Sequence, residues 1–408
     1  MSSQDISLRV EAPRHIAAST LRRRLLARVL GRSTRGRITV ECPSGGRQVF
    51  DSGAAGSDAY LQLRRDRAIS RLGLGGDIGF AEAFIDGDWD TPDLVGLLRY
   101  GVENQDSLDG ALSASVLHKV WNRVRHAMRA NTRAGSRRNV AFHYDLGNAF
   151  YARWLDTTMS YSAALFDRPG QDLAGAQDAK YRRLADTVGL RRGERVLEIG
   201  CGWGGFAETA VRGYGCDVVG LTLSKEQRLY TESRMRRTGC RKNAEVRLQD
   251  YRDATGEYDA IVSIEMFEAV GEENWPAFFD KLRTLLKPGG RAGIQVITIN
   301  ERRFETYRRR PDFIQKYIFP GGMLPSPTRF ESLARSTGLQ IADRFFFGDS
   351  YAETLRQWHA NFLAAWPEIA ELGFDERFLR MWTYYLAYCE VGFRTGAIDV
   401  AQYTLIRP

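Results

Sequence analysis

Two glutamates, Glu265 and Glu268, lie three residues apart in the otherwise apolar stretch Ile264-Glu-Met-Phe-Glu-Ala269. One helical turn would place both carboxyl groups on the same face. Neighbouring carboxylates repel one another, and an apolar environment penalises their charge, so at least one pKa should be raised. A carboxylate with a raised pKa accepts protons near neutral pH, which makes the pair a candidate general base. The alternative for Glu265 is a cap or an ion pair with an arginine.

A glycine-rich turn, Gly200-Cys-Gly-Trp-Gly-Gly205, follows the apolar segment Val196–Ile199 and precedes a helical pattern. Such a turn lets bare backbone approach a nucleotide-like ligand. A dinucleotide site would place an acid about 20 residues later, at the end of the second strand. Here Glu226 falls inside the next helix instead, and Glu198 precedes the glycines within the first strand. The pattern favours S-adenosylmethionine over a dinucleotide.

The elements that must position these residues alternate between strand and helix from about residue 140. This alternation predicts an α/β domain, with a parallel sheet covered on both faces and ligands at the carboxyl ends of its strands. Two stretches, 140–185 and 300–328, interrupt the alternation, and such insertions usually form a lid or a substrate pocket. The strand candidates are Arg195–Ile199, Asp217–Leu223, Ala244–Gln249, Asp259–Ile264, Arg291–Ile299 and Leu339–Phe347.

The N-terminal part has a different character. We expect a separate basic, lipid-engaging domain over residues 1–130, a linker over 131–139 and the α/β domain over 140–408. Arg37–Cys42 and Arg47–Phe50 are expected to be strands around a turn. The segment Leu21–Arg37 contains seven arginines and no acid, with leucines and valine at helical spacing. It predicts a basic amphipathic helix that binds an anionic membrane surface, or one that packs on its own domain.

Composition narrows the possible partners. The 408 residues carry a net charge of +8, which favours anionic partners. The arginine-rich segment contains no aromatic residue to stack on bases, which argues against nucleic acid. We find neither an apolar run long enough to span a membrane nor a secretory signal, and expect a cytoplasmic, peripherally membrane-associated protein. The five cysteines show no metal-ligand or disulfide spacing, so no metal is predicted.

Several motifs together resemble the cyclopropane-fatty-acyl-phospholipid synthases and their mycolic acid relatives. The Gly-Asp-Trp segment ending at Trp89 also resembles the first domain of the long bacterial members. The other matching segments are His143–Asn148, Met159–Ser162, Val196–Gly205, Leu221–Gln227, Phe267–Glu268, Tyr317–Pro320 and Phe362–Trp366.

The resemblance implies a class I S-adenosylmethionine-dependent methyltransferase fold, which is Rossmann-like with a seven-stranded, mostly parallel sheet. A smaller N-terminal α+β domain would precede it. The implied acyl-pocket insertion spans about 300–328 and includes the candidate substrate-binding residues Tyr317, Phe319 and Pro320. The implied cofactor contacts, beside Glu198, are Tyr161, Ser162, Gly200, Gly202, Thr222, Leu223, Ser224, Gln227, Asp250, Tyr251 and Ile264.

The implied reaction is methyl transfer to a cis double bond of an acyl chain in a phospholipid. The acyl chain then carries a positive charge that aromatic faces and carboxylates can stabilise, and it must lose a proton. Loss from the new methyl group closes a cyclopropane. A hydride shift before that loss gives a methylene branch, which a downstream reductase could convert to a methyl branch. A homodimer is a further possibility.

The family's cyclopropane-forming members are expected to use a bound bicarbonate as the base. The family holds this bicarbonate with four residues: a glutamate, a cysteine, a histidine and a tyrosine. This chain keeps the glutamate as Glu268, whereas Ala163, Ile297 and His359 replace the cysteine, the histidine and the tyrosine. Glu265, where such enzymes usually have glycine, is therefore a candidate replacement base, and the product is open. A non-catalytic lipid-binding relative and a nucleic-acid methyltransferase are the alternative functions.

Two further sets of residues have alternative interpretations. His143 is either a proton shuttle or a structural histidine. Tyr384, Tyr385, Tyr388 and Phe393 share a helical stripe that is typical of core packing, with acyl-chain lining as the alternative.

Overall fold

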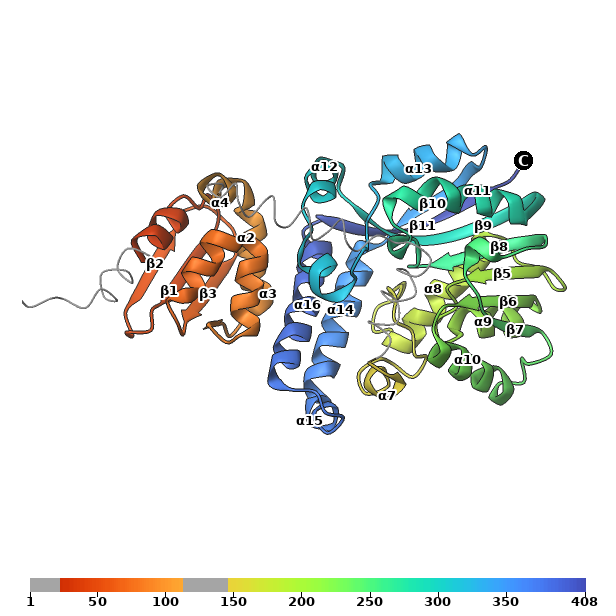
Figure 1. Ribbon diagram of the computed structural model, residues 1–408, viewed down its shortest axis with the longest axis horizontal. Coiled ribbons are helices and arrows are strands. Elements are labelled where there is room, and N and C mark those ends of the chain that lie inside the picture. Colours follow the sequence, from red (N-terminus) through yellow and green to blue (C-terminus); the bar gives the residue numbers. More distant parts are fainter. Residues whose placement is uncertain (1–22, 113–145) are drawn as a thin grey trace, which may run out of the picture. The chain divides into compact units, whose positions relative to one another are not determined.

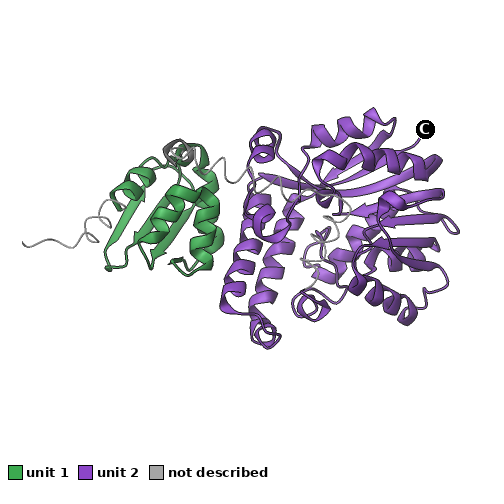
Figure 2. Cartoon of the chain, in the orientation of Figure 1, with its two compact units in different colours: residues 1–118 green, residues 119–408 purple. Residues whose placement is uncertain are grey.

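The computed structural model describes residues 23–112 and 146–408, and its contacts divide the chain into two units, 1–118 and 119–408 (Figure 2). The expected linker at 131–139 and His143 lie outside the described residues. No helix among the described residues is both long enough and apolar enough to cross a membrane.

The first unit contains a four-stranded sheet in the order β2-β1-β3-β4. β1 pairs antiparallel with β2, as the turn between them predicts, and parallel with β3. Residues 23–30 are helical, and Leu26, Val29 and Leu30 on this helix are buried. The elements are β1 (Arg37–Glu41), β2 (Arg47–Asp51), β3 (Asp58–Leu63), α2 (Arg67–Ile85), β4 (Trp89–Asp90), α3 (Leu94–Glu103) and α4 (Gln105–Leu112).

The second unit is built on a seven-stranded sheet in the order β10-β11-β9-β8-β5-β6-β7 (Figure 1). The strands from β9 to β7 are parallel, whereas β11 runs antiparallel between β9 and β10. This confirms the predicted α/β fold. The strands are β5 (Arg195–Ile199), β6 (Asp217–Thr222), β7 (Ala244–Leu248), β8 (Tyr258–Ile264), β9 (Leu286–Ile299), β10 (Gln340–Phe346) and β11 (Ile398–Ile406).

Helices cover both faces of this sheet, and a separate hydrophobic core lies between each face and its helices. Three of these helices, α8, α10 and α13, begin at side-chain caps: Asp172, Ser224 and Ser326 each accept a hydrogen bond from a backbone N–H three residues on. The helices are α7 (Asn148–Tyr151), α8 (Leu173–Thr187), α9 (Gly205–Tyr214), α10 (Lys225–Arg237), α11 (Trp275–Leu285), α12 (Glu301–Arg309), α13 (Pro327–Ser336), α14 (Gly348–Ala364), α15 (Trp366–Ala370) and α16 (Glu376–Arg394). Short turns are η1 (Tyr251–Asp253), η2 (Phe267–Ala269), η3 (Glu272–Asn274) and η4 (Ile314–Ile318).

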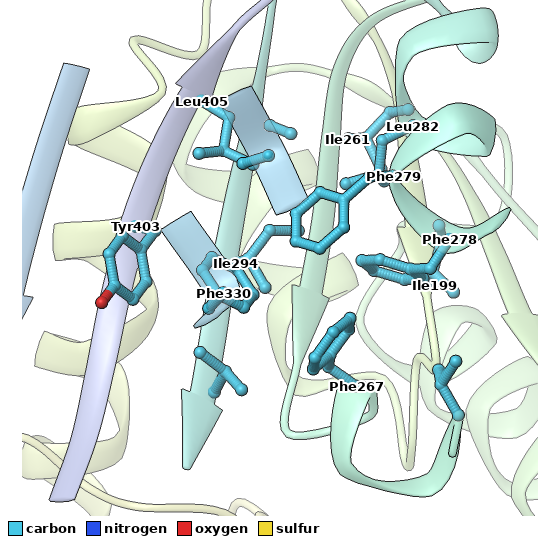
Figure 3. Close-up of a cluster of buried hydrophobic side chains, with 14 of the residues drawn as sticks. Ile199, Ile261, Phe267, Phe278, Phe279, Leu282, Ile294, Phe330, Tyr403 and Leu405 are labelled. Atoms are coloured by element: carbon cyan, nitrogen blue, oxygen red, sulfur yellow. The ribbon is translucent and has the colours of Figure 1, made fainter. Parts of the chain in front are cut away.

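The larger core lies between the sheet and helices α11 and α13 (Figure 3). Phe267 is fully buried there, with its ring centroid 5.6 Å from that of Phe279 and 5.3 Å from that of Phe330. Burying a phenylalanine stabilises the fold by about 2–3 kcal/mol. Because Phe267 directly precedes Glu268, this packing fixes the backbone of a candidate site residue.

Candidate active site

The glycine turn opens at the carboxyl end of β5, where the fold places ligands. Gly200 and Gly202 have φ angles of +84° and +51°, which side chains rarely allow. A Cβ on Gly202 would meet no described atom within 4 Å, so the turn faces open space. The backbone N–H groups of Gly200 and Cys201 donate to the Leu221 carbonyl at 3.0 and 2.9 Å. The turn is thereby joined to the end of β6.

The predicted cofactor residues after β6 form one buried network. The Thr222 hydroxyl donates to Gln227 Oε1 at 2.8 Å and accepts from the Ser224 N–H at 3.1 Å. Ser224 in turn caps α10 by accepting from the Gln227 N–H. Leu223 lies between Thr222 and Ser224 in the sequence. The network gives this edge a fixed shape beside the glycine turn.

Glu198, Asp250, Tyr251 and Ile264 lie on the neighbouring strands and turns. Asp250 is held by Arg252 in an ion pair of 2.6 Å, and Ile264 is the last residue of β8. Burial raises the pKa of Glu198 to about 8 and that of Tyr251 to about 12. Glu198 Oε2 and the Tyr251 hydroxyl are buried without a hydrogen-bond partner among the described residues. The space beside Gly202 and the unsatisfied polar atoms of Glu198 and Tyr251 together fit a nucleoside-containing cofactor.

Helix α8 holds the segment that carries Tyr161 and Ser162. Lys180 Nζ donates to Ser162 Oγ at 2.6 Å, and Gln177 Nε2 donates to the Ser162 carbonyl at 3.0 Å. Lys180 is fully buried, and desolvation lowers its pKa to about 7. The Tyr161 hydroxyl lies 2.7 Å from that of Tyr385 on α16. Sequence reasoning missed Lys180, because a lysine within an amphipathic helix is normally exposed.

Glu265 lies in a bend directly after β8, with a left-handed φ of +49°. The expected helical turn across 265–268 is therefore replaced by this bend and the short turn η2, because left-handed backbone cannot continue a right-handed helix. Its Oε1 accepts from the Ala163 N–H at 2.8 Å and from Gln295 Nε2 at 2.7 Å. Its Oε2 accepts from the Tyr351 hydroxyl at 2.7 Å. Burial raises the pKa of Glu265, whereas the charge of Lys180 and these donors oppose the rise.

Glu268 has fewer partners. Its Oε1 accepts from the Ile297 N–H at 2.6 Å, and its Oε2 is buried without a partner among the described residues. Desolvation raises the pKa of Glu268 to about 8, and the charge of Glu265 adds to the rise. Glu265 and Glu268 are both partly buried residues, and Glu268 Oε2 itself is enclosed by the protein.

The other three matched positions behave differently from one another. Ala163 and Ile297 reach the glutamates through backbone N–H groups rather than side chains. His359 on α14 has a buried Nε2 without a partner among the described residues, and burial lowers its pKa. The hydroxyl that reaches Glu265 comes from Tyr351, eight residues earlier on the same helix. No local sequence pattern singled out this tyrosine.

The 300–328 insertion borders the same pair. The Met323 N–H donates to the Glu268 carbonyl at 2.8 Å. Tyr317 lies in η4, and Phe319 and Pro320 follow it, each partly exposed. The Phe319 ring centroid lies 6.3 Å from that of Tyr385, which connects the insertion to Tyr161. The stripe on α16 is largely core, since Tyr384, Tyr385 and Phe393 are buried. Among described residues, no group of three or more acidic, histidine or cysteine side chains could hold a metal.

Comparison with known proteins assigns the site to a class. Residues 131–403 match the family described as mycolic acid cyclopropane synthetase. The chain is 42% identical to the tuberculostearic acid methyltransferase UfaA1 of Mycobacterium tuberculosis, over 84% of this chain and 82% of that relative. It is 35% identical to the cyclopropane-fatty-acyl-phospholipid synthase of Escherichia coli K12, over 87% of this chain and 89% of that relative.

Solved structures agree. The mycolic acid cyclopropane synthase CmaA1 complexed with SAH and CTAB has a TM-score of 0.63 at 33% identity, covering 66% of this chain and 98% of that chain. The fold and the site therefore define an S-adenosylmethionine-dependent methyltransferase, which confirms the predicted enzyme class and cofactor. The chain belongs to the mycolic acid cyclopropane synthetase family, and the predicted activity on unsaturated acyl chains is confirmed at family level.

Proposed function

We propose that this enzyme methylates a cis double bond in an acyl chain of a phospholipid, and that Glu265 then removes a proton to give a methylene branch. The observation that carries the proposal is the Glu265 carboxylate, held by three donors beside Glu268. A side-chain carboxylate has the same planar O–C–O group as bicarbonate. Glu265 would thus supply, as part of the chain, the base that the resemblance expects as a bound ion.

The two glutamates divide the roles of base and acid. Three donors stabilise the charged form of Glu265, whereas Glu268 accepts one backbone N–H and faces the charge of Glu265. Of the two carboxyl groups, Glu265 therefore ionises more readily, and Glu268 keeps its proton to higher pH. Two carboxyl groups whose environments push their pKa values apart are typical of an acid–base site.

When bound, S-adenosylmethionine supplies the methyl group and leaves the acyl chain positively charged. The glycine turn, the network from Thr222 to Gln227 and the segment at Tyr161 and Ser162 would hold that cofactor. Glu265 stabilises the positive charge at short range and receives the proton on its carboxylate. Tyr317, Phe319 and Pro320 of the insertion would line the acyl chain and exclude water.

The branched product is supported by similarity to a tuberculostearic acid methyltransferase at 42% identity. A methylene branch needs reduction before it becomes a methyl branch, so a downstream reductase stays a prediction, as does a homodimer. Peripheral attachment to an anionic membrane is likewise proposed, since the acyl substrate resides there.

Expression in a bacterium that lacks its own cyclopropane synthase tests the proposal. Fatty-acid mass spectrometry should show chains one CH₂ heavier, with fragmentation that locates a methylene branch. Glu265→Gln should reduce this product by about 100-fold or more, because general-base catalysis contributes about 10²–10⁴. Glu257→Gln, at an exposed position, is the matched control. A cyclopropane product would refute the branch, and unchanged lipids from well-expressed protein would refute the activity.

A further inference from the structure

A buried chain of hydrogen bonds runs from an ion pair near the surface to Glu265. Arg183 on α8 donates through Nη2 to Asp343 Oδ2 and through Nη1 to Gln402 Oε1, both at 2.9 Å. Gln402 Nε2 donates to Gln295 Oε1 at 3.0 Å. Gln295 Nε2 then donates to Glu265 Oε1 at 2.7 Å. Gln295 and Gln402 are 0% and 1% exposed, so water does not compete for these bonds.

The direction of this chain is fixed from two sides. A guanidinium group only donates hydrogen bonds, so the oxygen of Gln402 must face Arg183. The amide nitrogen of Gln402 also faces the Lys180 carbonyl at 3.2 Å, which only accepts. With Gln402 oriented in this way, the oxygen of Gln295 must be the acceptor, and its NH₂ group must point at Glu265.

The two oxygens of Glu265 consequently differ. Oε1 faces two N–H donors, from Gln295 and Ala163, and neither nitrogen can accept a proton in return. Oε2 faces the Tyr351 hydroxyl, which can either donate or accept. Only Oε2 can therefore carry a proton without placing two donors against each other.

We propose that Arg183, Gln402 and Gln295 are positioning residues that keep Glu265 Oε1 an acceptor, so that the proton from the alkylated acyl chain is taken up at Oε2. This inference rests on the proposed role of Glu265 as base. In the step, after a hydride shift has moved the positive charge to the methylated carbon, a C–H bond of the new methyl group breaks. Its electron pair forms the C=C double bond of the methylene branch and neutralises that charge. The proton forms an O–H bond at Oε2, and the Tyr351 hydroxyl rotates to accept from it.

Other charged and titratable groups also face Glu265. Lys180 on α8 stabilises the carboxylate when protonated, and Glu268 on η2 destabilises it when ionised. Tyr351 on α14 stays protonated, because burial and the charge of Glu265 raise its pKa well above the ordinary value. Gln295 and the Ala163 N–H are neutral donors that do not titrate, so their effect on Glu265 is constant across pH.

The test is the pH dependence of kcat for the full chain, measured with saturating S-adenosylmethionine and vesicles of unsaturated phospholipid. Gln295→Leu should move the acid limb of kcat up by about one pH unit, because a lost donor destabilises the carboxylate. Arg183→Met should move it in the same direction by less. Arg182→Met is the matched control, since Arg182 pairs with Asp178 on the exposed face of the same helix. KM should change little.

Calorimetric measurement of S-adenosylhomocysteine binding reports whether each variant is folded. If Gln295→Leu is not folded, Arg183→Met alone carries the test. If the acid limbs of kcat in Gln295→Leu and Arg183→Met lie at the same pH as that of Arg182→Met, the positioning role is overturned. Glu265→Gln in the same assay separates the two ideas. If that variant keeps full kcat, the base assignment fails. If it is inactive while the other profiles are unchanged, only the hydrogen-bond chain fails.

Discussion

At the scale of single residues, the backbone of Glu265 is strained where the chemistry is proposed. Glu265 and Met159 are the non-glycine residues with positive φ in the described ranges. A left-handed conformation costs a non-glycine residue about 1–2 kcal/mol. Glycine would avoid that cost at position 265, yet only a glutamate brings a carboxylate to Ala163, Gln295 and Tyr351. The strain is therefore explained by the carboxylate that it positions.

Removing that side chain should leave a site for a small carboxylate. Glu265→Gly relieves the backbone and leaves three donors around a space of carboxylate size. We expect turnover to fall about 100-fold or more and to recover in part when formate or bicarbonate is added. Glu265→Gln is the control, because its amide fills the same space and should block rescue. Equal responses of the two variants to formate would contradict the role of the space.

The residues of this site differ in how far sequence could predict them. The Glu265 and Glu268 pair was visible because both lie in one short segment. Its side-chain donors Gln295 and Tyr351 were not, since they are 30 and 86 residues away along the chain, and Ala163 was placed at the site only by the family resemblance. No local pattern relates such positions, and only the packed fold brings them together.

At the scale of elements, period and turn signals located most of the sheet. The predicted strand Arg195–Ile199 coincides with β5, and the others agree within a few residues at most ends. The predicted strands did not include β11, Ile398–Ile406, which follows helix α16 and runs antiparallel between β9 and β10. Strand–helix alternation predicts parallel neighbours and therefore says nothing about an antiparallel strand of this kind. Gln402 lies on that strand.

Helix α8 provides a prediction about stability. Its buried Lys180 has a pKa of about 7, below the ordinary 10.5, because burial penalises the ammonium. The unfolded chain then binds more protons than the folded chain between these values, so this penalty is full below about pH 7 and disappears as pH rises towards 10.5. Lys180→Met should therefore raise the free energy of unfolding relative to wild type more at pH 7 than at pH 10.

Urea denaturation at the two pH values measures this difference. Lys242→Met, at an exposed position, is the control and should show no such pH dependence. Lys180→Met also removes the donor to Ser162 Oγ. The affinity for S-adenosylhomocysteine should therefore fall by about tenfold, which is the loss expected for one hydrogen bond to a charged group. A stability difference that is the same at pH 7 and pH 10 would show that Lys180 titrates normally.

At the scale of the whole molecule, the first unit contains the basic helix that was predicted to bind an anionic membrane surface. The predicted arginine-rich helix is present over residues 23–30, but Leu26, Val29 and Leu30 are buried within its own unit. Most of that apolar face is therefore not available for insertion into lipid, although Leu25 on the same helix is 50% exposed. Arg24, Arg28 and Arg32 are exposed, and Arg23 pairs with Asp66. Attachment through this helix must then be mainly electrostatic.

Electrostatic attachment makes a definite prediction about salt. A basic residue near an anionic surface contributes about 1 kcal/mol, so replacing Arg24, Arg28 and Arg32 by glutamine should weaken binding about 100-fold at low salt. Wild-type binding to vesicles containing anionic lipid should also fall steeply as ionic strength rises, since screening shortens the range of the attraction. Vesicle co-sedimentation measures both effects.

The control replaces Arg168, Arg236 and Arg241, three exposed arginines of the second unit, and changes the net charge equally. If both triple variants bind alike, the first unit contributes only through overall charge, and the lipid-engaging role assigned to it is wrong.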